Sequence, residues 1–191
     1  MKATKIQRVK ICCIQSIAEA WLAISYGASA LGLVSEIPSG PGPISEELIQ
    51  QIAAIIPPGV TSVLLTSKTD TQEIIGQQRR CGVNAIQIVD RLETGGYQDF
   101  RDAFPGISII QVIHVSGEES VAEAVSVAPH VNAILLDSGN PALHVKELGG
   151  TGRTHDWNIS RKIRESVAVP IFLAGGLNPD NVAHAIRQVR P

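Results

Sequence analysis

Residues 133–174 carry the pattern that decides the fold. Ala133-Ile-Leu-Leu-Asp137 is a short apolar run, a segment of helical periodicity follows over Trp157–Ser166, and Ile171-Phe-Leu-Ala174 is a second apolar run. Short apolar runs on either side of a helical segment are typical of a β–α–β unit with parallel strands. The stretch therefore predicts two parallel strands joined by a helix.

The same alternation extends over the rest of the chain. Further strands are expected at 9–14, 30–34, 62–65, 85–89 and 108–113, and helices are expected after each of them, the last one at 178–189. Seven such units fit a closed barrel or a doubly wound open sheet. The strands are followed on one side by polar, glycine-rich loops, as in barrel enzymes. We predict an α/β protein with a (β/α)8 TIM barrel fold, one domain over residues 1–191, whose eighth strand and helix are missing at the C-terminus.

Composition narrows the class of protein. The 191 residues are 44% hydrophobic and 18% charged, with a formal net charge of −2 and no cluster of Lys and Arg, so a nucleic-acid partner is not expected. The start MKATKIQRVK lacks the apolar segment of a secretory signal, and no apolar run approaches the roughly 20 residues of a membrane span. Three cysteines without a C-x-x-C pair predict reduced thiols and no zinc site. A cytoplasmic protein is the expectation.

Two glycine pairs follow predicted strands. Gly149-Gly150-Thr151-Gly152 lies after the sixth strand, and Gly175-Gly176 comes directly after the seventh. Glycine lets backbone N–H groups approach an anion closely, and barrel enzymes often bind phosphate in the loops after their last strands. The sequence therefore predicts a phosphate site, and the alternative for each loop alone is a plain turn.

Candidate acid and base groups also stand at strand ends. Asp137 ends the sixth strand and Asp90 ends the fourth, where a half-buried carboxylate can act as an acid or base, or simply cap a loop. Cys12 ends the first strand and is either a small buried apolar residue or, as a thiolate, a base. Side-chain alternation along a strand places Cys12 and Cys13 on opposite faces, so only one of them is expected to face the barrel mouth.

Asp90 is also a candidate for contact with a substrate, as are three further polar residues. Gln87 lies in the fourth strand, His114 ends the fifth strand, and His155 lies beside the glycine loop. For His114, a hydrogen-bonded core histidine is the alternative.

In their order along the chain, these motifs resemble phosphoribosylanthranilate isomerase of tryptophan biosynthesis. The motifs are Lys10-Ile-Cys12, Gly27-Ala-Ser-Ala-Leu-Gly32, Leu135-Leu-Asp137-Ser138, Gly149-Gly-Thr-Gly152 with Asp156-Trp157, and Leu173-Ala-Gly-Gly-Leu-Asn-Pro-Asp-Asn-Val182. The resemblance implies an Amadori rearrangement of an aminoaldose phosphate to a 1-amino-1-deoxyketose phosphate. It makes Asp137 the general acid, Cys12 the general base, and the glycines at 149–152 and 175–176 the phosphate site. It calls for no metal and no organic cofactor.

The chain departs from that family at places that bind the substrate. The family usually has C-G-I-T where this chain has Cys12-Cys13-Ile14-Gln15, and an arginine that holds the anthranilate carboxylate where this chain has Gly42. The fourth strand ends Gln87-Ile-Val89-Asp90 in place of Q-L-H-G. The departures concern substrate recognition more than the acid and base.

Two other hypotheses follow from these departures. One is a non-catalytic relative that binds a phosphosugar on the same barrel, and the other is an isomerase or aldolase that uses Asp90 and Asp137 as its acid–base pair. In each case the partner is a small phosphosugar rather than a nucleic acid or a membrane, and the protein is expected to be a monomer or a homodimer.

Overall fold

The computed structural model describes residues 7–38 and 40–191, and within them one parallel sheet of seven strands curls into a ring. Each strand pairs with the next along the chain, as in a barrel. The strands are β1 (Lys10–Ile11), β2 (Ala30–Val34), β3 (Thr61–Thr66), β4 (Ala85–Ile88), β5 (Ser108–His114), β6 (Ala133–Asp137) and β7 (Ile171–Leu173).

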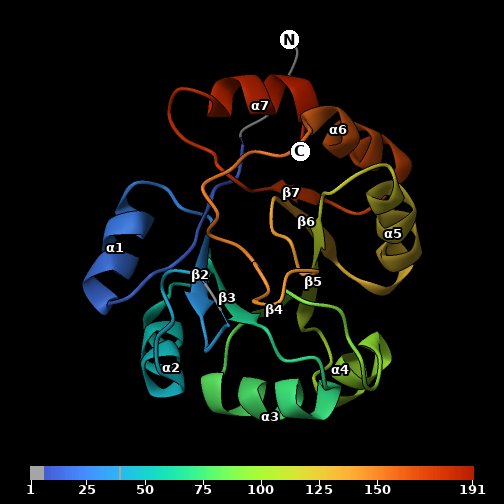
Figure 1. Cartoon of the computed structure of the whole chain (residues 1–191). Coiled ribbons are helices and arrows are strands. Elements are labelled where there is room, and N and C mark those ends of the chain that lie inside the picture. Colours follow the sequence, from blue (N-terminus) through green and yellow to red (C-terminus); the bar gives the residue numbers. More distant parts are fainter. Residues whose placement is uncertain (1–6, 39) are drawn as a thin grey trace.

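Helices cover the outside of this ring (Figure 1). They are α1 (Ile17–Ser25), α2 (Glu46–Ile55), α3 (Thr71–Cys81), α4 (Tyr97–Ala103), α5 (Glu119–Val127), α6 (Trp157–Ser166) and α7 (Val182–Val189), with a 3-10 turn at Ala128–His130. The predicted (β/α)8-type fold is confirmed, and the described residues contain seven of its units. No helix in the described part of the chain has the length and apolar character to cross a membrane.

Side-chain alternation divides the core into two layers. One set of side chains, including Ala30, Val63, Val112 and Leu135, fills the interior of the ring. The other set lies between the strands and the helices, and it forms two clusters around Phe100 and Leu33. Because both faces of the sheet are covered, nearly all strand residues are apolar, which explains the continuous apolar runs in the sequence.

Side-chain caps fix where the helices begin. Ser16 Oγ accepts a hydrogen bond from Glu19 N at the start of α1, Asp70 Oδ1 accepts from Gln72 N and Glu73 N before α3, and Asp156 Oδ1 accepts from Asn158 N before α6. These bonds satisfy backbone donors that the helix itself leaves unpaired. Each cap therefore also fixes the end of the strand-to-helix loop before it.

Two predicted elements are shorter in the structure. The first strand, expected over 9–14, has ladder pairing only at Lys10–Ile11, because it has one neighbouring strand and because Cys13 leaves the extended region with φ = +61°. The last helix, expected from Asn178, begins at Val182. Asn178 instead forms a turn in which its Oδ1 accepts hydrogen bonds from Asp180 N and Asn181 N.

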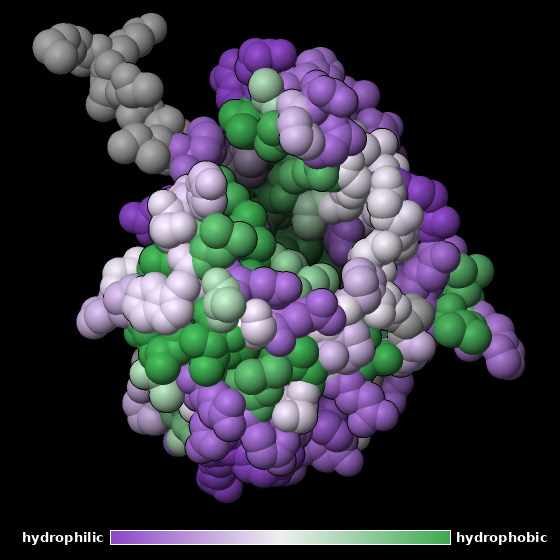
Figure 2. Space-filling model, turned by 90° about the vertical axis from the view of Figure 1, so that its left-hand side faces the viewer, coloured by the Kyte–Doolittle hydropathy of each residue, from purple (hydrophilic) through white to green (hydrophobic). Residues whose placement is uncertain are grey.

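The ring is open between β7 and β1. Within the described residues β1 pairs with β2 and β7 pairs with β6, so each has one unpaired edge. Large apolar side chains are exposed beside this gap, among them Val9 (49%), Leu22 (58%) and Tyr26 (86%). Figure 2, which faces α1, shows a hollow with apolar walls on this side of the molecule. An open, apolar edge of this kind is a surface that normally lies against another strand or helix.

Candidate active site

Asp137 lies at the end of β6 and is half buried between the two glycine loops. A methyl group placed on Gly175 would lie 3.0 Å from Asp137 Oδ1, and one placed on Gly149 would lie 3.2 Å from Asp137 Oδ2. Asp137 Oδ1 also accepts a hydrogen bond from Ser138 N at 2.7 Å. The absence of side chains on both glycines thus leaves the carboxylate accessible from the barrel mouth.

The two glycine loops touch one another. A methyl group on Gly176 would lie 2.6 Å from the carbonyl carbon of Arg153 and 2.7 Å from Thr154 N, directly after the first glycine loop. Gly149, Gly150, Gly152, Gly175 and Gly176 all have positive φ values. Thr151 joins the loop to β6, because its hydroxyl lies 2.8 Å from Ser138 Oγ. The structure therefore brings the two predicted phosphate-site loops into contact, with Gly149 and Gly175 beside Asp137.

Cys12 follows β1 and faces the interior of the ring. A methyl group on Gly32 of β2 would lie 2.8 Å from Cys12 Sγ and 3.2 Å from Leu65, a member of the interior cluster. Lys10, two residues earlier and on the same face, donates a hydrogen bond to Cys12 Sγ at 2.7 Å. The sulfur is exposed, and a positive charge stands against the atom that would carry the charge of a thiolate.

Cys13 also faces the mouth, contrary to the prediction from alternation. Alternation does not extend to Cys13, because the strand ends at Ile11 and Cys13 adopts a left-handed conformation with φ = +61°. Its side chain packs against the interior cluster, and its pKa is raised, chiefly by burial and then by the neighbouring Cys12. Cys13 is thus a neutral thiol, and Cys12 is the better candidate for a base.

The loop after β2 connects Cys13 to the glycine loop. A methyl group on Gly42 would lie 2.6 Å from Cys13 Cβ, and a methyl group on Gly150 would lie 2.3 Å from Pro41 Cδ. The Cys13 thiol in turn faces Pro41 O at 3.5 Å. These contacts bring together the loops that follow β1, β2 and β6.

We expect Gly42→Ala to destabilise the protein by about 3 kcal/mol, because it adds a side chain at φ = +88° and overlaps Cys13. In a Cys13→Gly background the same change should cost at least about 1 kcal/mol less, because the overlapping Cβ is gone. Urea unfolding of the wild type, the two single variants and the double variant measures this difference in the free energy of unfolding. Equal costs in the two backgrounds would show that the contact does not exist.

Asp90 and His114, two of the predicted substrate contacts, are held by the loop that follows β6. Asp90 is 8% exposed, and its Oδ2 accepts a hydrogen bond from Lys146 Nζ at 2.5 Å. The His114 ring bonds to Val89 O through Nε2 at 2.9 Å and packs against Gly139. The Asp90 carboxylate therefore already has a partner within the protein, whereas Nδ1 of His114 is buried without a hydrogen-bond partner.

Gln87, the third predicted contact, is buried inside the ring, and its Oε1 has no hydrogen-bond partner. A buried acceptor of this kind is a place where a ligand or water can bind.

His155 lies beside the glycine loop, and its Nε2 is 2.6 Å from Ser160 Oγ. Its pKa is lowered, chiefly by burial, although Asp137 and Asp156 oppose the shift. In the unfolded chain the pKa of a histidine is about 6.5, so as the pH falls His155 binds a proton in the unfolded state at a higher pH than in the folded state. The native state therefore loses stability as the pH falls below about 6.5.

We expect His155→Gln to reduce the loss of unfolding free energy between pH 7.5 and pH 5.0. His144→Gln, a change at an exposed residue of the same loop, is the matched control and should retain the wild-type loss. Urea unfolding at the two pH values measures both. A His155→Gln protein with the wild-type pH dependence would contradict the inference that this histidine is kept neutral.

The sequence analysis did not predict two residues that bond to candidate site residues, Lys10 with Cys12 and Lys146 with Asp90. Lys10 could have been found, because a residue two positions before Cys12 lies on the same face of a strand. Lys146 could not, because it lies in a long loop 56 residues from Asp90. Within the described residues no group of three or more His, Cys, Asp or Glu side chains is placed to hold a metal ion.

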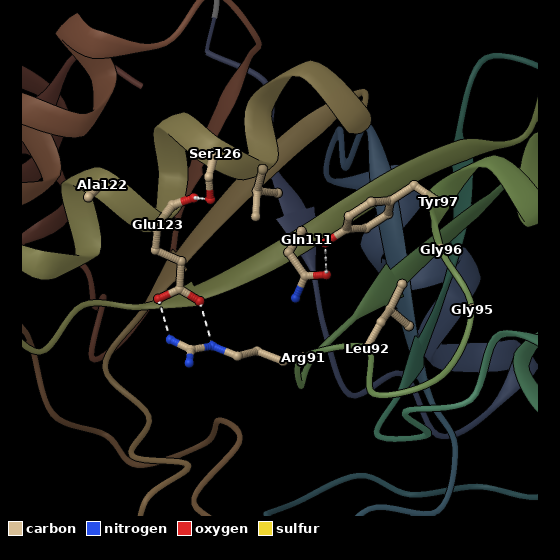
Figure 3. Close-up of a pocket in the computed structure, with 10 residues that line it drawn as sticks. Arg91, Leu92, Gly95, Gly96, Tyr97, Gln111, Ala122, Glu123 and Ser126 are labelled. Carbon is tan, nitrogen blue, oxygen red and sulfur yellow. Dashed lines mark hydrogen bonds and ion pairs between the residues drawn. The ribbon is translucent and has the colours of Figure 1, made fainter.

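A cavity of about 630 Å³ lies elsewhere, on the outside of the ring between α4 and α5 (Figure 3). Arg91 donates two hydrogen bonds of 2.8 Å to Glu123, and Tyr97 donates one of 2.9 Å to Gln111. The polar groups of this cavity bond to one another. A second cavity, of about 500 Å³, lies between β1 and α1, and Cys12 and Cys13 line it, whereas Asp137 does not.

Comparison with known proteins shows the family of the chain. The family model described as N-(5'phosphoribosyl)anthranilate (PRA) isomerase matches residues 9–191. The chain belongs to the phosphoribosylanthranilate isomerase family. It is 37% identical over 185 residues to N-(5'-phosphoribosyl)anthranilate isomerase 2 of Methanosarcina mazei, covering 96% of this chain and 81% of the relative. It is 33% identical to the isomerase of Methanocella arvoryzae, over 96% and 84% of the two chains.

Solved structures of this family have the same fold. The phosphoribosylanthranilate isomerase of Thermotoga maritima superposes with a TM-score of 0.78 at 31% identity, covering 97% of this chain and 85% of that one. A family member in complex with reduced 1-(o-carboxyphenylamino)-1-deoxyribulose 5-phosphate superposes with a TM-score of 0.75 at 29% identity, over 97% and 84% of the two chains. Family members are isomerases of tryptophan biosynthesis, so the predicted family and class of enzyme are confirmed.

Proposed function

We propose that this chain catalyses the Amadori rearrangement of N-(5'-phosphoribosyl)anthranilate, or of a related aminoaldose phosphate, with Asp137 as acid and Cys12 as base. The observation that carries the proposal is the place of Asp137. A half-buried carboxylate stands at the end of a barrel strand, bordered on both sides by glycines that can receive a phosphorylated sugar.

In the first step, the Asp137 carboxyl group donates a proton to the ring oxygen of the sugar. The bond between that oxygen and C1 breaks as the nitrogen lone pair forms the C1–N double bond of a Schiff base. Proton transfer by a positioned side chain typically accelerates such a step about 10²–10⁴-fold. Gly149 and Gly175 support this role, because any side chain there would cover the carboxylate.

In the second step, the Cys12 thiolate removes the proton from C2. The electrons of the C–H bond form a C1–C2 double bond, and the C1–N double bond becomes single. The resulting enolamine takes up a proton at C1 while its C2 hydroxyl group loses one, which gives the 2-ketose. The hydrogen bond from Lys10 Nζ to Cys12 Sγ supports this role, because it holds the sulfur in place beside a proton donor.

Backbone donors of residues 149–152 and 175–176 would hold the phosphate. Positive φ values along both loops allow successive N–H groups to point into one concavity, which is the geometry of an anion-binding nest. Thr151 would add its hydroxyl group. Asp90 is the weaker candidate for a second acid–base group, because its Oδ2 is already bonded to Lys146 and its Oδ1 to Arg91 N.

Turnover of freshly prepared N-(5'-phosphoribosyl)anthranilate by the purified protein tests the proposed function. We expect conversion to 1-(o-carboxyphenylamino)-1-deoxyribulose 5-phosphate, measured by chromatography. Binding of the substrate by calorimetry without any conversion would contradict the proposal and support the non-catalytic alternative.

We further propose a cytoplasmic protein that is a monomer or a homodimer. Three free cysteines support a reducing compartment. Both association states are known in the family, since monomers have been made from the dimeric enzyme of Thermotoga maritima.

A further inference from the structure

Three residues at the lip of the mouth, beside Cys12 and Lys10, carry no charge. We define the neutral lip as Cys13, Pro41 and Gly42. The Cys13 side chain contacts both of the other residues. We propose that this enzyme recognises the sugar phosphate of its substrate and makes no ion pair with a carboxylate on the attached amine. Anthranilate could then be replaced by an uncharged aromatic amine. This inference rests on the proposed function and specifies its substrate class.

The first argument is that position 42 cannot present a side chain to the mouth. A Cβ atom there would lie 2.6 Å from Cys13 Cβ and 3.0 Å from both Cys13 Cα and Sγ, and Gly42 has φ = +88°. The Cys13 side chain occupies the space instead, and its raised pKa keeps it neutral. Neither residue can therefore supply a positive charge at this lip.

The second argument concerns the cations around the rest of the mouth. The strand-to-helix loops contain four Lys and Arg residues, and each is ion-paired with a carboxylate of the protein. The pairs are Lys68–Glu73, Arg91–Glu123, Lys146–Asp90 and Arg153–Glu147. Lys10, inside the ring, is bonded to Cys12 Sγ. A substrate carboxylate would have to compete with a protein carboxylate for any of these four loop cations.

The third argument is energetic. A site built to bond a polar substrate group rejects an analogue without that group by about 10⁴–10⁵-fold, because its own polar groups are left unpaired. Here the lip has no such group to leave unpaired. A substrate with a carboxylate and one without it should therefore be treated alike.

The test compares kcat/KM for N-(5'-phosphoribosyl)anthranilate and N-(5'-phosphoribosyl)aniline, which lacks the carboxylate. We expect the two values to agree within tenfold. A preference for the anthranilate compound of more than tenfold would overturn the inference. The Thermotoga maritima relative, assayed in parallel, shows whether the pair of compounds can reveal a preference at all.

An added cation tests whether the lip faces the amine. Pro41→Arg places a guanidinium on an exposed position of the lip, and Pro41→Gln is the neutral control of similar length. We expect the arginine variant to raise the preference for the anthranilate compound at least fivefold over the glutamine variant. Equal preferences in the two variants would show that the neutral lip does not face the amine of the substrate, and would overturn the inference.

Binding separates this inference from the proposed chemistry. Calorimetry with two reduced product analogues, one with the carboxylate and one without it, measures the preference for the carboxylate as a ratio of affinities. This measurement needs no turnover. Equal affinities support the neutral lip even if neither substrate is converted, in which case the proposed function alone fails. More than tenfold tighter binding of the carboxylate analogue overturns the inference.

Discussion

Asp137→Asn should lower kcat for N-(5'-phosphoribosyl)anthranilate by about 10³-fold, the largest effect that we expect of any single substitution. Asparagine keeps the shape of the side chain and cannot supply the proton that the ring oxygen needs. KM should change little, because the glycine loops that surround the residue keep their conformation. Steady-state kinetics with freshly prepared substrate measures both constants.

Asp90→Asn is the matched control for that result. Asp90 also ends a strand, but Lys146 engages its carboxylate, so we expect less than a tenfold loss of kcat. A large loss in Asp90→Asn together with an active Asp137→Asn protein would reverse the assignment. Large losses in both would favour the hypothesis of a paired acid and base.

Cys12→Ala should lower kcat by about 10²–10³-fold, because it removes the group that takes the proton from C2. Cys12→Ser should be impaired as well, since a hydroxyl group is a much weaker base than a thiolate at neutral pH. The rate of exchange or transfer of deuterium from C2 of a labelled substrate reports the same step directly.

Cys81→Ala is the control for loss of a thiol. Cys81 is buried on α3, far from the mouth in the fold, and burial raises its pKa to about 12. We expect this variant to lose stability and to retain its turnover. A fully active Cys12→Ser protein would remove Cys12 from the mechanism.

Most of the fold followed from the sequence because local pattern and tertiary structure agree. The run Ala30–Val34 is a strand with the bounds that its apolar residues indicate, and Trp157–Ser166 is a helix with the predicted bounds. The bounds of β1 and α7 could not be predicted in the same way. They depend on a positive φ at Cys13 and on a turn at Asn178, which no periodic pattern records.

The site was only partly predictable, because spacing along the chain does not show which loops meet. Asp137 and the glycines at 149–152 and 175–176 were recognisable from strand ends and glycine pairs. The contact between Cys13 and Gly42 joins two residues at which the chain departs from the family pattern. In the structure they are one feature, since the side chain gained at position 13 occupies the space that a side chain at position 42 would need.

A crystal structure with reduced 1-(o-carboxyphenylamino)-1-deoxyribulose 5-phosphate is the most direct test of the account. We predict the phosphate against the backbone of residues 149–152 and 175–176, and the ribulose carbons between Cys12 Sγ and the Asp137 carboxylate. The account would be contradicted if the ligand bound elsewhere, for example in the outer cavity beside Tyr97, or if Cys12 Sγ or the Asp137 carboxylate lay away from the ribulose carbons.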